Sequence, residues 1–398
     1  MKSDAPPRHR LTVIAALGVV QILAWGSSFY LLSVLATPIA ADTAWPIAWI
    51  VGGLSVGLIV AGLVSPRVGT FIGRHGGRPV LAASAAVMAL GLVVLGLATS
   101  LAGYVFAWVL LGLGMGTGLY DAAFATLGRL YGDAARPSIG ALTLWGGFAS
   151  TVSWPVSAVL IEHVGWRGTC FAYAGLQLAV ALPLVVLLIP PPPRLPSTAS
   201  TGTGAARRRL SRRERRTFWL MASIVTLGST VTTLVSVHLL VLLQARGVAL
   251  ASAVSFGALI GPAQVGARVL EMAGRGRHHP LWTLTMAMGL IAIGVGVLAL
   301  GLPAVALALI LYGAGNGIYS IARGTVPLAL FGAEGYAPLM GRLARPGLVA
   351  AALAPLLGAF VLAHGGADVL LTVLAGLAAA NAALVGLLWR ATAAAGSG

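Results

Sequence analysis

The segment Gly114-Met-Gly-Thr-Gly-Leu-Tyr120 recurs 199 residues later as Gly313-Ala-Gly-Asn-Gly-Ile-Tyr319, and each copy lies within a long apolar run. Thr126 and Thr325, which follow the two copies, keep the same offset. Similarity at a nearly constant spacing along a chain indicates a duplicated structural unit. Two shorter matches have similar offsets: Gly26-Ser-Ser28 with Gly228-Ser-Thr230 at 202, and Val68-Gly69 with Val265-Gly266 at 197.

The chain around these repeats is too apolar for a protein dissolved in water. Of the 398 residues, 58% are hydrophobic and 9% are charged, whereas soluble domains carry about 25% charged residues. The 53 glycines suit helices that pack closely in lipid. Because about 20 apolar residues span a bilayer as a helix, the chain has room for roughly twelve spans.

Apolar runs and their breaks predict an all-α membrane protein of twelve transmembrane helices in two halves. We predict a six-helix bundle at 1–189, a cytoplasmic linker at 190–216 and a second bundle at 217–398. Because six is even, the two bundles insert with the same orientation, and a pseudo-two-fold axis runs along the membrane normal. The predicted spans are 11–36, 46–64, 79–99, 103–128, 139–161, 168–189, 217–243, 250–270, 281–301, 303–330, 339–363 and 368–390.

The formal net charge is +16, and its placement indicates topology rather than nucleic-acid binding. With the N-terminus inside, 23 of the 25 Lys and Arg residues fall in inside segments, and only Arg167 and Arg246 fall outside. Cytoplasmic loops carry such an excess, so we expect a multi-pass inner-membrane protein with both termini cytoplasmic. We expect the first helix to be an uncleaved anchor, and the cluster from Arg207 to Arg216 to orient the chain and contact anionic lipid.

One loop carries a family resemblance. The segment Gly69-Thr-Phe-Ile-Gly73-Arg74-His-Gly76-Gly-Arg78-Pro-Val-Leu81 resembles the loop pattern of the major facilitator superfamily, and Gly165-Trp166-Arg167 is similar to an outer segment of that family. The resemblance implies the major facilitator fold and transport by alternating access. It also implies a set of gate and loop residues: Gly69, Arg74, Gly76, Arg78 and Arg129.

Departures from the family patterns narrow the expected branch. The family's loop has an acid that helps latch the cytoplasmic gate, and this chain has Gly73 there, so we expect the latch to be missing or rebuilt. Drug:proton antiporters have Arg and Gln where this chain has Trp108 and Leu111, and Gly-Pro where it has Trp154-Pro155. The remaining resemblance is to the monocarboxylate-porter-like branch, which implies small organic acids as substrates.

Asp121 is the only acid well inside a predicted span. A charge in a membrane helix costs at least about 2.5–3.5 kcal/mol, so such residues face the bundle interior or a wet cavity. A low-dielectric cavity favours the protonated carboxyl, whereas a nearby arginine favours the charged one. Two roles follow for Asp121: proton coupling, or a fixed ion pair that closes the inner gate.

Arg323 and Arg268 are the most deeply placed arginines in the predicted spans. A guanidinium can hold a carboxylate by two hydrogen bonds, so these are the candidates for binding an anionic substrate. The alternative is a gate contact or snorkelling at the cytoplasmic ends of the helices. Arg268 stands three residues before Glu271, so we also expect a local helical pair between them.

Other polar residues gather on the spans that line the cavity in the resembled family. Small polar residues in lipid also join helices by hydrogen bonds, so cavity lining and helix packing both remain open for them. His238 is either a proton site or a satisfied polar residue near the outer end. The substrate-lining candidates, besides the two arginines, are Gln21, Trp25, Ser28, Tyr30, Tyr120, Ser229, Thr233, Asn316 and Tyr319.

Nothing in the sequence predicts an enzyme. The glycine runs lack the Lys-Ser/Thr of a nucleotide loop, so close packing or a hinge is the better interpretation. Cys170 is the single cysteine, and no zinc spacing or catalytic triad is readable, so we expect no cofactor or metal. We expect a monomeric secondary transporter of a small organic anion, coupled to protons. The alternatives are an efflux antiporter and a membrane sensor that binds ligand without moving it.

Overall fold

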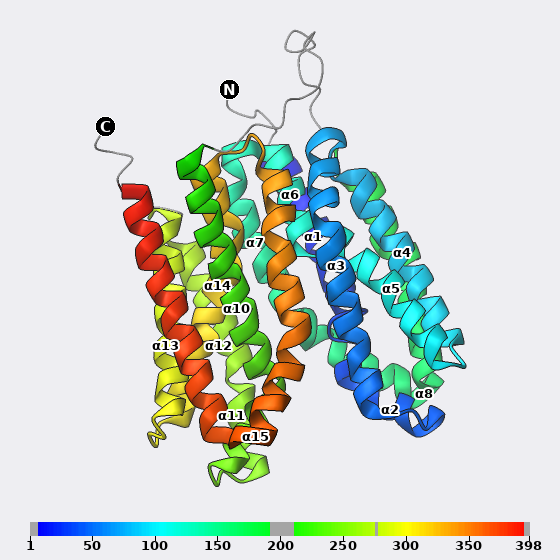
Figure 1. Ribbon diagram of the computed structural model, residues 1–398. Helices are drawn as coiled ribbons and strands as arrows, with labels where there is room; N and C mark the ends of the chain where they lie inside the picture. Colours follow the sequence, from blue (N-terminus) through cyan, green and yellow to red (C-terminus); the bar gives the residue numbers. More distant parts are fainter. Residues whose placement is uncertain (1–6, 192–210, 275–277, 394–398) are drawn as a thin grey trace.

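The computed structural model describes residues 7–191, 211–274 and 278–393, and nearly all of them are helical (Figure 1). The N-terminal half contains α1 (Pro7–Gly26), α2 (Leu32–Thr43), α3 (Ile47–His75), α4 (Arg78–Leu97), α5 (Leu101–Gly118), α6 (Tyr120–Tyr131), η1 (Gly132–Ala135), α7 (Arg136–Gly147), α8 (Ala149–Leu176), η2 (Gln177–Ala181) and α9 (Leu182–Leu188). The C-terminal half contains α10 (Arg212–Ala245), α11 (Leu250–Ala258), α12 (Ile260–Ala273), α13 (Pro280–Ala299), α14 (Val305–Phe331) and α15 (Tyr336–Ala393).

Within the described residues, nine helical stretches are long and apolar enough to cross a membrane. One of them spans 88 residues and α15 has 58, both far longer than a bilayer core of about 30 Å allows. Each is broken at a glycine of positive φ, Gly165 (φ 68°) and Gly366 (φ 76°), and Figure 1 shows α15 turning back on itself. The membrane-spanning helical fold is confirmed, while the count of twelve crossings and the half boundaries stay predictions.

Several spans predicted as continuous helices are interrupted. The predicted helix 103–128 breaks at Leu119, whose extended backbone (ψ −173°) separates α5 from α6 directly after the first glycine run. The predicted helix 11–36 breaks between α1 and α2. The second glycine run instead stays inside the continuous α14. Apolar periodicity does not reveal such breaks, because they depend on whether neighbouring helices supply hydrogen-bond partners to the backbone groups that the break leaves unpaired.

Each half has an apolar core of its own. One core of buried side chains lies wholly within 221–388, and another lies wholly within 31–174. Two further cores cross between the halves: Leu328, Tyr336, Ala337 and Met340 join N-terminal residues in one, and Ala351 and Ala352 do so in the other. The halves are therefore separate packing units that meet along a limited seam.

The glycine runs serve close helix packing, as expected, but in a different register from the sequence match. A side chain on Gly112 would meet the Gly57 carbonyl of α3, and one on Gly313 would meet the Ile260 carbonyl of α12. The equivalent pairs have an offset of 201 rather than 199, because an alternating glycine pattern matches itself equally well two residues along. The paired positions, judged by the helix that each faces, are Gly112 with Gly313, Gly114 with Gly315, and Gly116 with Gly317.

The two outer arginines of the sequence make equivalent contacts in the two halves. Arg167 pairs with Asp42 at 3.1 Å and donates to the Gly96 and Ala98 carbonyls at the end of α4. Arg246 pairs with Asp368 at 2.7 Å and donates to the Ala299 carbonyl at the end of α13. Each arginine therefore joins the ends of the first, third and sixth predicted spans of its half, although the acid and the base exchange positions between the halves.

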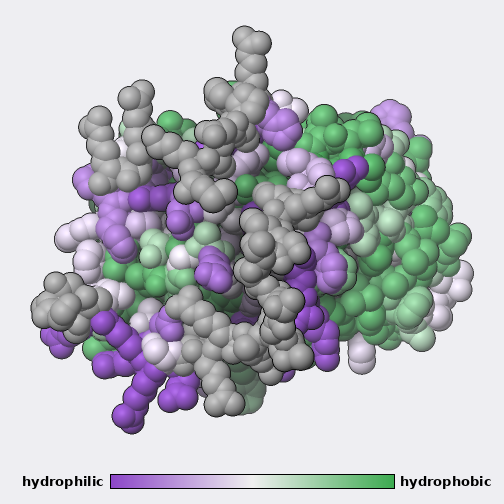
Figure 2. Space-filling view, turned by 90° about the horizontal axis from the view of Figure 1, so that it is seen from above, coloured by the Kyte–Doolittle hydropathy of each residue, from purple (hydrophilic) through white to green (hydrophobic). Residues whose placement is uncertain are grey.

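We call the end of the bundle where α1 begins and α15 ends the proximal end, and the opposite end the distal end. Figure 2 views the proximal end and shows hydrophilic side chains gathered there, with hydrophobic ones on the flank. Helix ends at this face carry most of the described arginines, among them Arg74, Arg129, Arg136, Arg212, Arg216, Arg342 and Arg390. This grouping matches the charge distribution on which the orientation prediction depends.

The halves touch through their proximal parts. The elements in substantial contact across the seam are α3 with α15, α6 with α14 and α15, and α7 with α12 and α14. At the tightest point, Gly69 of α3 lies against the Ala337 carbonyl and Gly341 of α15, and Gly341 lies against the Ser65 carbonyl. Among the described residues, no such contact joins α2 or the distal part of α8 to α10 or α11. The contacts between the halves are therefore concentrated on the proximal side.

We expect Gly69→Leu to weaken the proximal closure, because a side chain there overlaps the α15 backbone and overpacking costs about 1–3 kcal/mol. Spin labels at Arg74 and Arg342, both exposed near the seam, measure the opening by pulsed electron paramagnetic resonance in a Cys170→Ser background. The label distance should shift to a longer population. Gly52→Leu is the matched control, because a side chain on Gly52 of the same helix meets open space. An unchanged distance in Gly69→Leu contradicts the seam assignment.

Candidate functional site

An ion pair joins the two halves on the proximal side of their centre. Arg323 Nη2 of α14 donates to Asp121 Oδ2 of α6 at 2.5 Å, and the side chains are only 20% and 15% exposed. Removing two charges from water costs several kcal/mol per ion, so a pair at such a place requires close geometry. The two residues selected separately from the sequence therefore meet across the seam.

The second oxygen of Asp121 has no partner. Oδ1 is buried and makes no hydrogen bond within the described part of the chain. Leaving a buried acceptor unsatisfied costs about 1–3 kcal/mol, and more for a charged group. A proton on this oxygen would neutralise the carboxylate and weaken its attraction to Arg323. Both roles considered for Asp121, a gate pair and a protonation site, therefore stay open.

Arg268 of α12 makes a second contact across the seam. The residue is 5% exposed, and its Nη1 donates to the Thr143 carbonyl of α7 at 3.1 Å. Nε donates within the C-terminal half, to the Ser320 hydroxyl at 3.1 Å and the Gly317 carbonyl at 3.3 Å. The expected local pair with Glu271 is absent: Glu271 accepts a hydrogen bond from Thr283 at 2.7 Å, because Arg268 is drawn toward the seam.

Two adjacent glycines make room for this contact where α7 ends. A side chain on Gly147 would overlap Arg268 Nη1, and one on Gly146 would overlap the Tyr120 hydroxyl. Tyr120 OH donates to the Thr143 carbonyl at 3.4 Å, so the tyrosine and the arginine converge on one oxygen. Thr143, Gly146 and Gly147 are not among the residues predicted from the sequence; the glycine pair inside an apolar run was the available signal.

Aromatic side chains of the N-terminal half form a continuous row toward this point. We define the aromatic row as Trp154, Tyr30, Trp25, Tyr120 and Phe124. Its successive ring centroids are 6.3, 6.1, 5.2 and 5.2 Å apart. Trp154 is 48% exposed, whereas Phe124 is fully buried against Gly324 beside the ion pair. The row therefore leads from an exposed side chain to the closed proximal seam.

Several predicted lining residues are engaged in helix packing in this conformation. Gln21 is fully buried, with Nε2 donating to the Gly118 carbonyl at 2.7 Å and Oε1 accepting from Trp25. Ser28 is fully buried and donates to the Ala24 carbonyl. Tyr319 OH donates to the Val225 carbonyl at 3.5 Å. These groups lie around the breaks and helix contacts of the site rather than open to a substrate.

Other predicted lining residues have side chains that remain available. Thr233 and Asn316 are half-buried, and neither side chain makes a hydrogen bond to a described residue. Ser229 is half-buried beside Gly347. His238, considered as a proton site, is buried with Nε2 3.2 Å from the Pro355 carbonyl oxygen. His238 thus lies away from the Asp121–Arg323 pair.

The loop residues of the family resemblance act mainly through packing. Gly73, which replaces the expected acid, lies against Pro338 of α15, and Gly76 adopts φ 83° to end α3. Arg74 is exposed and Arg78 and Arg129 are partly exposed; among the described residues none of the three makes an ion pair. In place of an acid, this loop has glycines that lie against α15, so whether the latch is missing or rebuilt stays a prediction.

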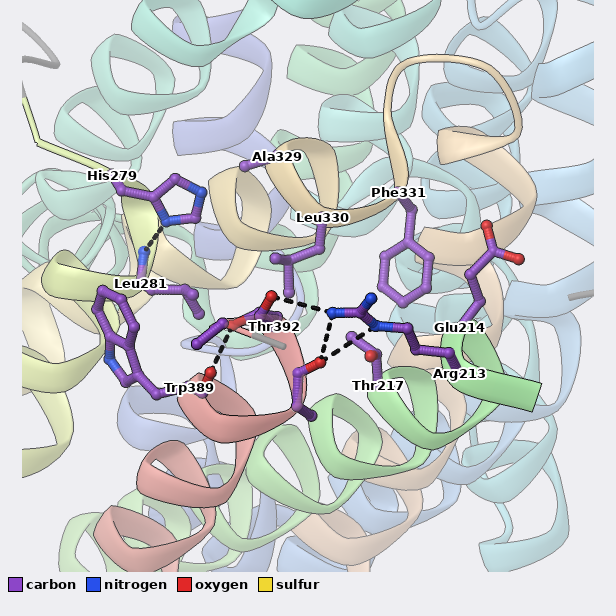
Figure 3. Close-up of a pocket in the computed structure, with 12 residues that line it drawn as sticks. Arg213, Glu214, Thr217, His279, Leu281, Ala329, Leu330, Phe331, Trp389 and Thr392 are labelled. Atoms are coloured by element: carbon purple, nitrogen blue, oxygen red, sulfur yellow. Dashed lines mark hydrogen bonds between the residues drawn. The ribbon is translucent and has the colours of Figure 1, made fainter. Parts of the chain in front are cut away.

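A separate cavity of about 450 Å³ lies at the proximal end of the C-terminal half, away from the seam (Figure 3). Arg213 donates to the Ala391 and Thr392 carbonyls and so caps the end of α15. Burial and the positive charge of Arg136 lower the pKa of His279, which suits its neutral role of accepting the Leu281 N–H. These groups stabilise helix ends. No cluster of metal-ligating side chains occurs in the part of the chain that the structure describes.

The family model "Major Facilitator Superfamily" matches residues 17–341. The chain belongs to this superfamily. It is accordingly a multi-pass membrane transporter rather than an enzyme, and the fold expectation from the loop motif is confirmed. No curated protein sequence matches the chain.

Solved structures of other major facilitator proteins resemble this transporter over nearly its whole length. The human organic anion transporter MFSD10 (TETRAN) matches with a TM-score of 0.74 and 18% identity, covering 96% of this chain and 100% of the other. The proton:xylose symporter XylE gives 0.71 and 15%, covering 95% of each chain. FucP in the outward conformation gives 0.73 and 13%, covering 96% and 99%. At these identities the likeness concerns the fold.

We expect Asp121 and Arg323 to be energetically coupled. Asp121→Asn and Arg323→Gln should each destabilise the protein, because each leaves a buried charge unpaired. The double variant should recover about 0.5–3 kcal/mol relative to the sum of the single effects, measured by thermal unfolding in detergent. The Asp42–Arg167 pair is the matched control: its side chains are 51% and 37% exposed, so its coupling should stay below about 1 kcal/mol. Additive effects at Asp121 and Arg323 would contradict the pair.

Proposed function

We propose that this transporter moves a small organic anion together with a proton by alternating access. The observation that carries the proposal is the charge balance of the central layer, which holds two arginines and one acid: Arg323 pairs with Asp121, and Arg268 donates to the Thr143 carbonyl. Glu271, one turn along α12 from Arg268, lies within electrostatic reach of Arg136. One positive charge of the layer is thus left over, and a monoanionic substrate would balance it.

The arginines retain donors for such a substrate. Arg323 uses only Nη2 toward Asp121, and Arg268 uses Nε and Nη1. A guanidinium has five N–H donors in a planar fork that fits a carboxylate, so hydrogen-bonding capacity remains on both. The likeness to an organic anion transporter adds support for an anionic substrate.

Protonation of Asp121 would couple the proton to the gate. A proton at the orphaned Oδ1 removes the charge that attracts Arg323, and this ion pair joins α6 to α14 across the closed seam. The anion then takes the place of Asp121 as the charge partner of the arginines while the seam opens. The likeness to proton symporters supports protons as the coupling ion.

The proposed orientation follows from the positive charges at the proximal end. With that end in the cytoplasm of an inner-membrane protein, the structure faces outward and the seam is the cytoplasmic gate. The anion and the proton would enter distally and leave into the cytoplasm. Because one chain supplies both walls of the layer, the proposed functional unit is a monomer surrounded by lipid.

Proteoliposomes with an imposed pH gradient test the proposal, with lactate, pyruvate and glutarate as probes and protein-free liposomes subtracted. We expect Asp121→Asn to abolish uptake driven by the pH gradient, because the side chain at this position can no longer take up the proton. Exchange of substrate for substrate across the membrane should persist. Arg268→Gln should raise KM about tenfold or more, the equivalent of about 1.4 kcal/mol.

Asp42→Asn is the control, since it removes an acid paired with an arginine at the distal end, away from the layer. It should keep both gradient-driven uptake and KM. Intact pH dependence in Asp121→Asn would exclude the coupling role. Normal substrate affinity in both Arg268→Gln and Arg323→Gln would exclude an anionic substrate. Substrate movement that the gradient drives only outward would indicate efflux.

A further inference from the structure

Tyr120 of the aromatic row and Arg268 donate to the same oxygen atom. Tyr120 OH donates to the Thr143 carbonyl oxygen at 3.4 Å, and Arg268 Nη1 donates to that oxygen at 3.1 Å. The row comes from the N-terminal half and the guanidinium from the C-terminal half. Aromatic side chains of the N-terminal half therefore lie next to a guanidinium of the C-terminal half.

Tyr30 is a second member of the aromatic row that lies near Arg268. It lies between Trp25 and Trp154, with centroids 6.1 and 6.3 Å away, and it is half-buried. Arg268 lies near enough to act electrostatically on the Tyr30 hydroxyl. That hydroxyl makes no hydrogen bond to a described residue, so it remains free to bind a ligand beside the guanidinium.

Packing alone does not account for the exposed part of this row. A helix contact in lipid favours small residues that let backbones approach, and Gly26 already supplies such an approach by lying against Ser153 of α8. The ring contact between Tyr30 and Trp154 is a further contact between the same parts of the chain. Trp154 remains 48% exposed, and its ring meets Tyr30 edge to face at 89°. A flat aromatic group beside these rings would add ring contacts to those that the row already makes.

We infer that the substrate is an aromatic carboxylate, whose ring packs against Trp25, Tyr30 and Trp154 while its carboxylate is held by Arg268. This inference rests on the proposed function and names the substrate class of the same site. Aromatic rings attract one another in offset or edge-to-face arrangements at centroid distances of about 4.5–7 Å. An aromatic acid gains this attraction beyond the burial of its area, and a saturated ring of similar size does not.

Equilibrium binding to the full chain in lipid nanodiscs, measured by calorimetry, tests the inference with three matched probes. Benzoate carries both features, cyclohexanecarboxylate replaces the aromatic ring by a saturated one, and benzamide removes the charge. We expect benzoate to bind about threefold to tenfold more tightly than cyclohexanecarboxylate, and benzamide to bind more weakly than either acid.

Variants separate the ring contacts from the charge contact. Trp154→Leu and Tyr30→Leu should each bring benzoate close to cyclohexanecarboxylate while leaving the latter nearly unchanged; Trp154 is exposed, so its variant should fold. Trp282→Leu is the control, because Trp282 packs against Trp389 at 5.1 Å outside the seam, and it should keep the preference. Arg268→Gln should weaken both acids.

Each outcome bears on one of the two proposals. Equal binding of benzoate and cyclohexanecarboxylate to the unaltered protein, or a preference that survives Trp154→Leu and Tyr30→Leu, overturns the aromatic substrate but leaves an organic anion transporter. Benzamide binding as tightly as benzoate overturns the role of Arg268 toward the carboxylate. Transport of none of the organic acids, aromatic ones included, overturns the proposed function itself.

Discussion

A charge inside a lipid-embedded bundle is tolerated only where protein covers it and supplies a partner. In this chain the two halves together meet that requirement. Asp121 from α6 finds Arg323 from α14, and Arg268 from α12 finds the Thr143 carbonyl of α7. Neither half alone supplies these contacts, so separating the proximal seam exposes three charged groups at once. The free energy of closing the seam is therefore tied to the protonation and ligation of the groups within it.

The two halves share an architecture but differ in chemistry. Their glycine-packed helices and distal arginine contacts are equivalent. At the centre, however, the N-terminal half contributes the aromatic row and the acid, and the C-terminal half contributes the two arginines. A duplicated scaffold thus presents unlike walls to the space between them, which suits a solute with one apolar part and one charged part.

The fold was largely predictable because hydrophobic runs and charge placement report directly on the solvent around each segment. The candidate site was only partly predictable. Asp121, Arg268 and Arg323 stand out because charges are rare in such spans, yet nothing in a single sequence says which of them meet. The carbonyl of Thr143 and the room made by Gly147 are properties of the folded backbone. The break at Leu119 and the repeat register likewise depend on neighbouring helices.

The arginines at the distal rim, Arg167 and Arg246, each bind two other segments of their own half. These contacts keep the helices of each bundle from sliding past one another at the distal end. A braced bundle rotates as one body, so a small tilt about the glycine contact between α3 and α15 produces a larger displacement at the rim. Because the distal rim lies far from that contact, rotation of rigid bundles can separate the halves there without any bending of the helices.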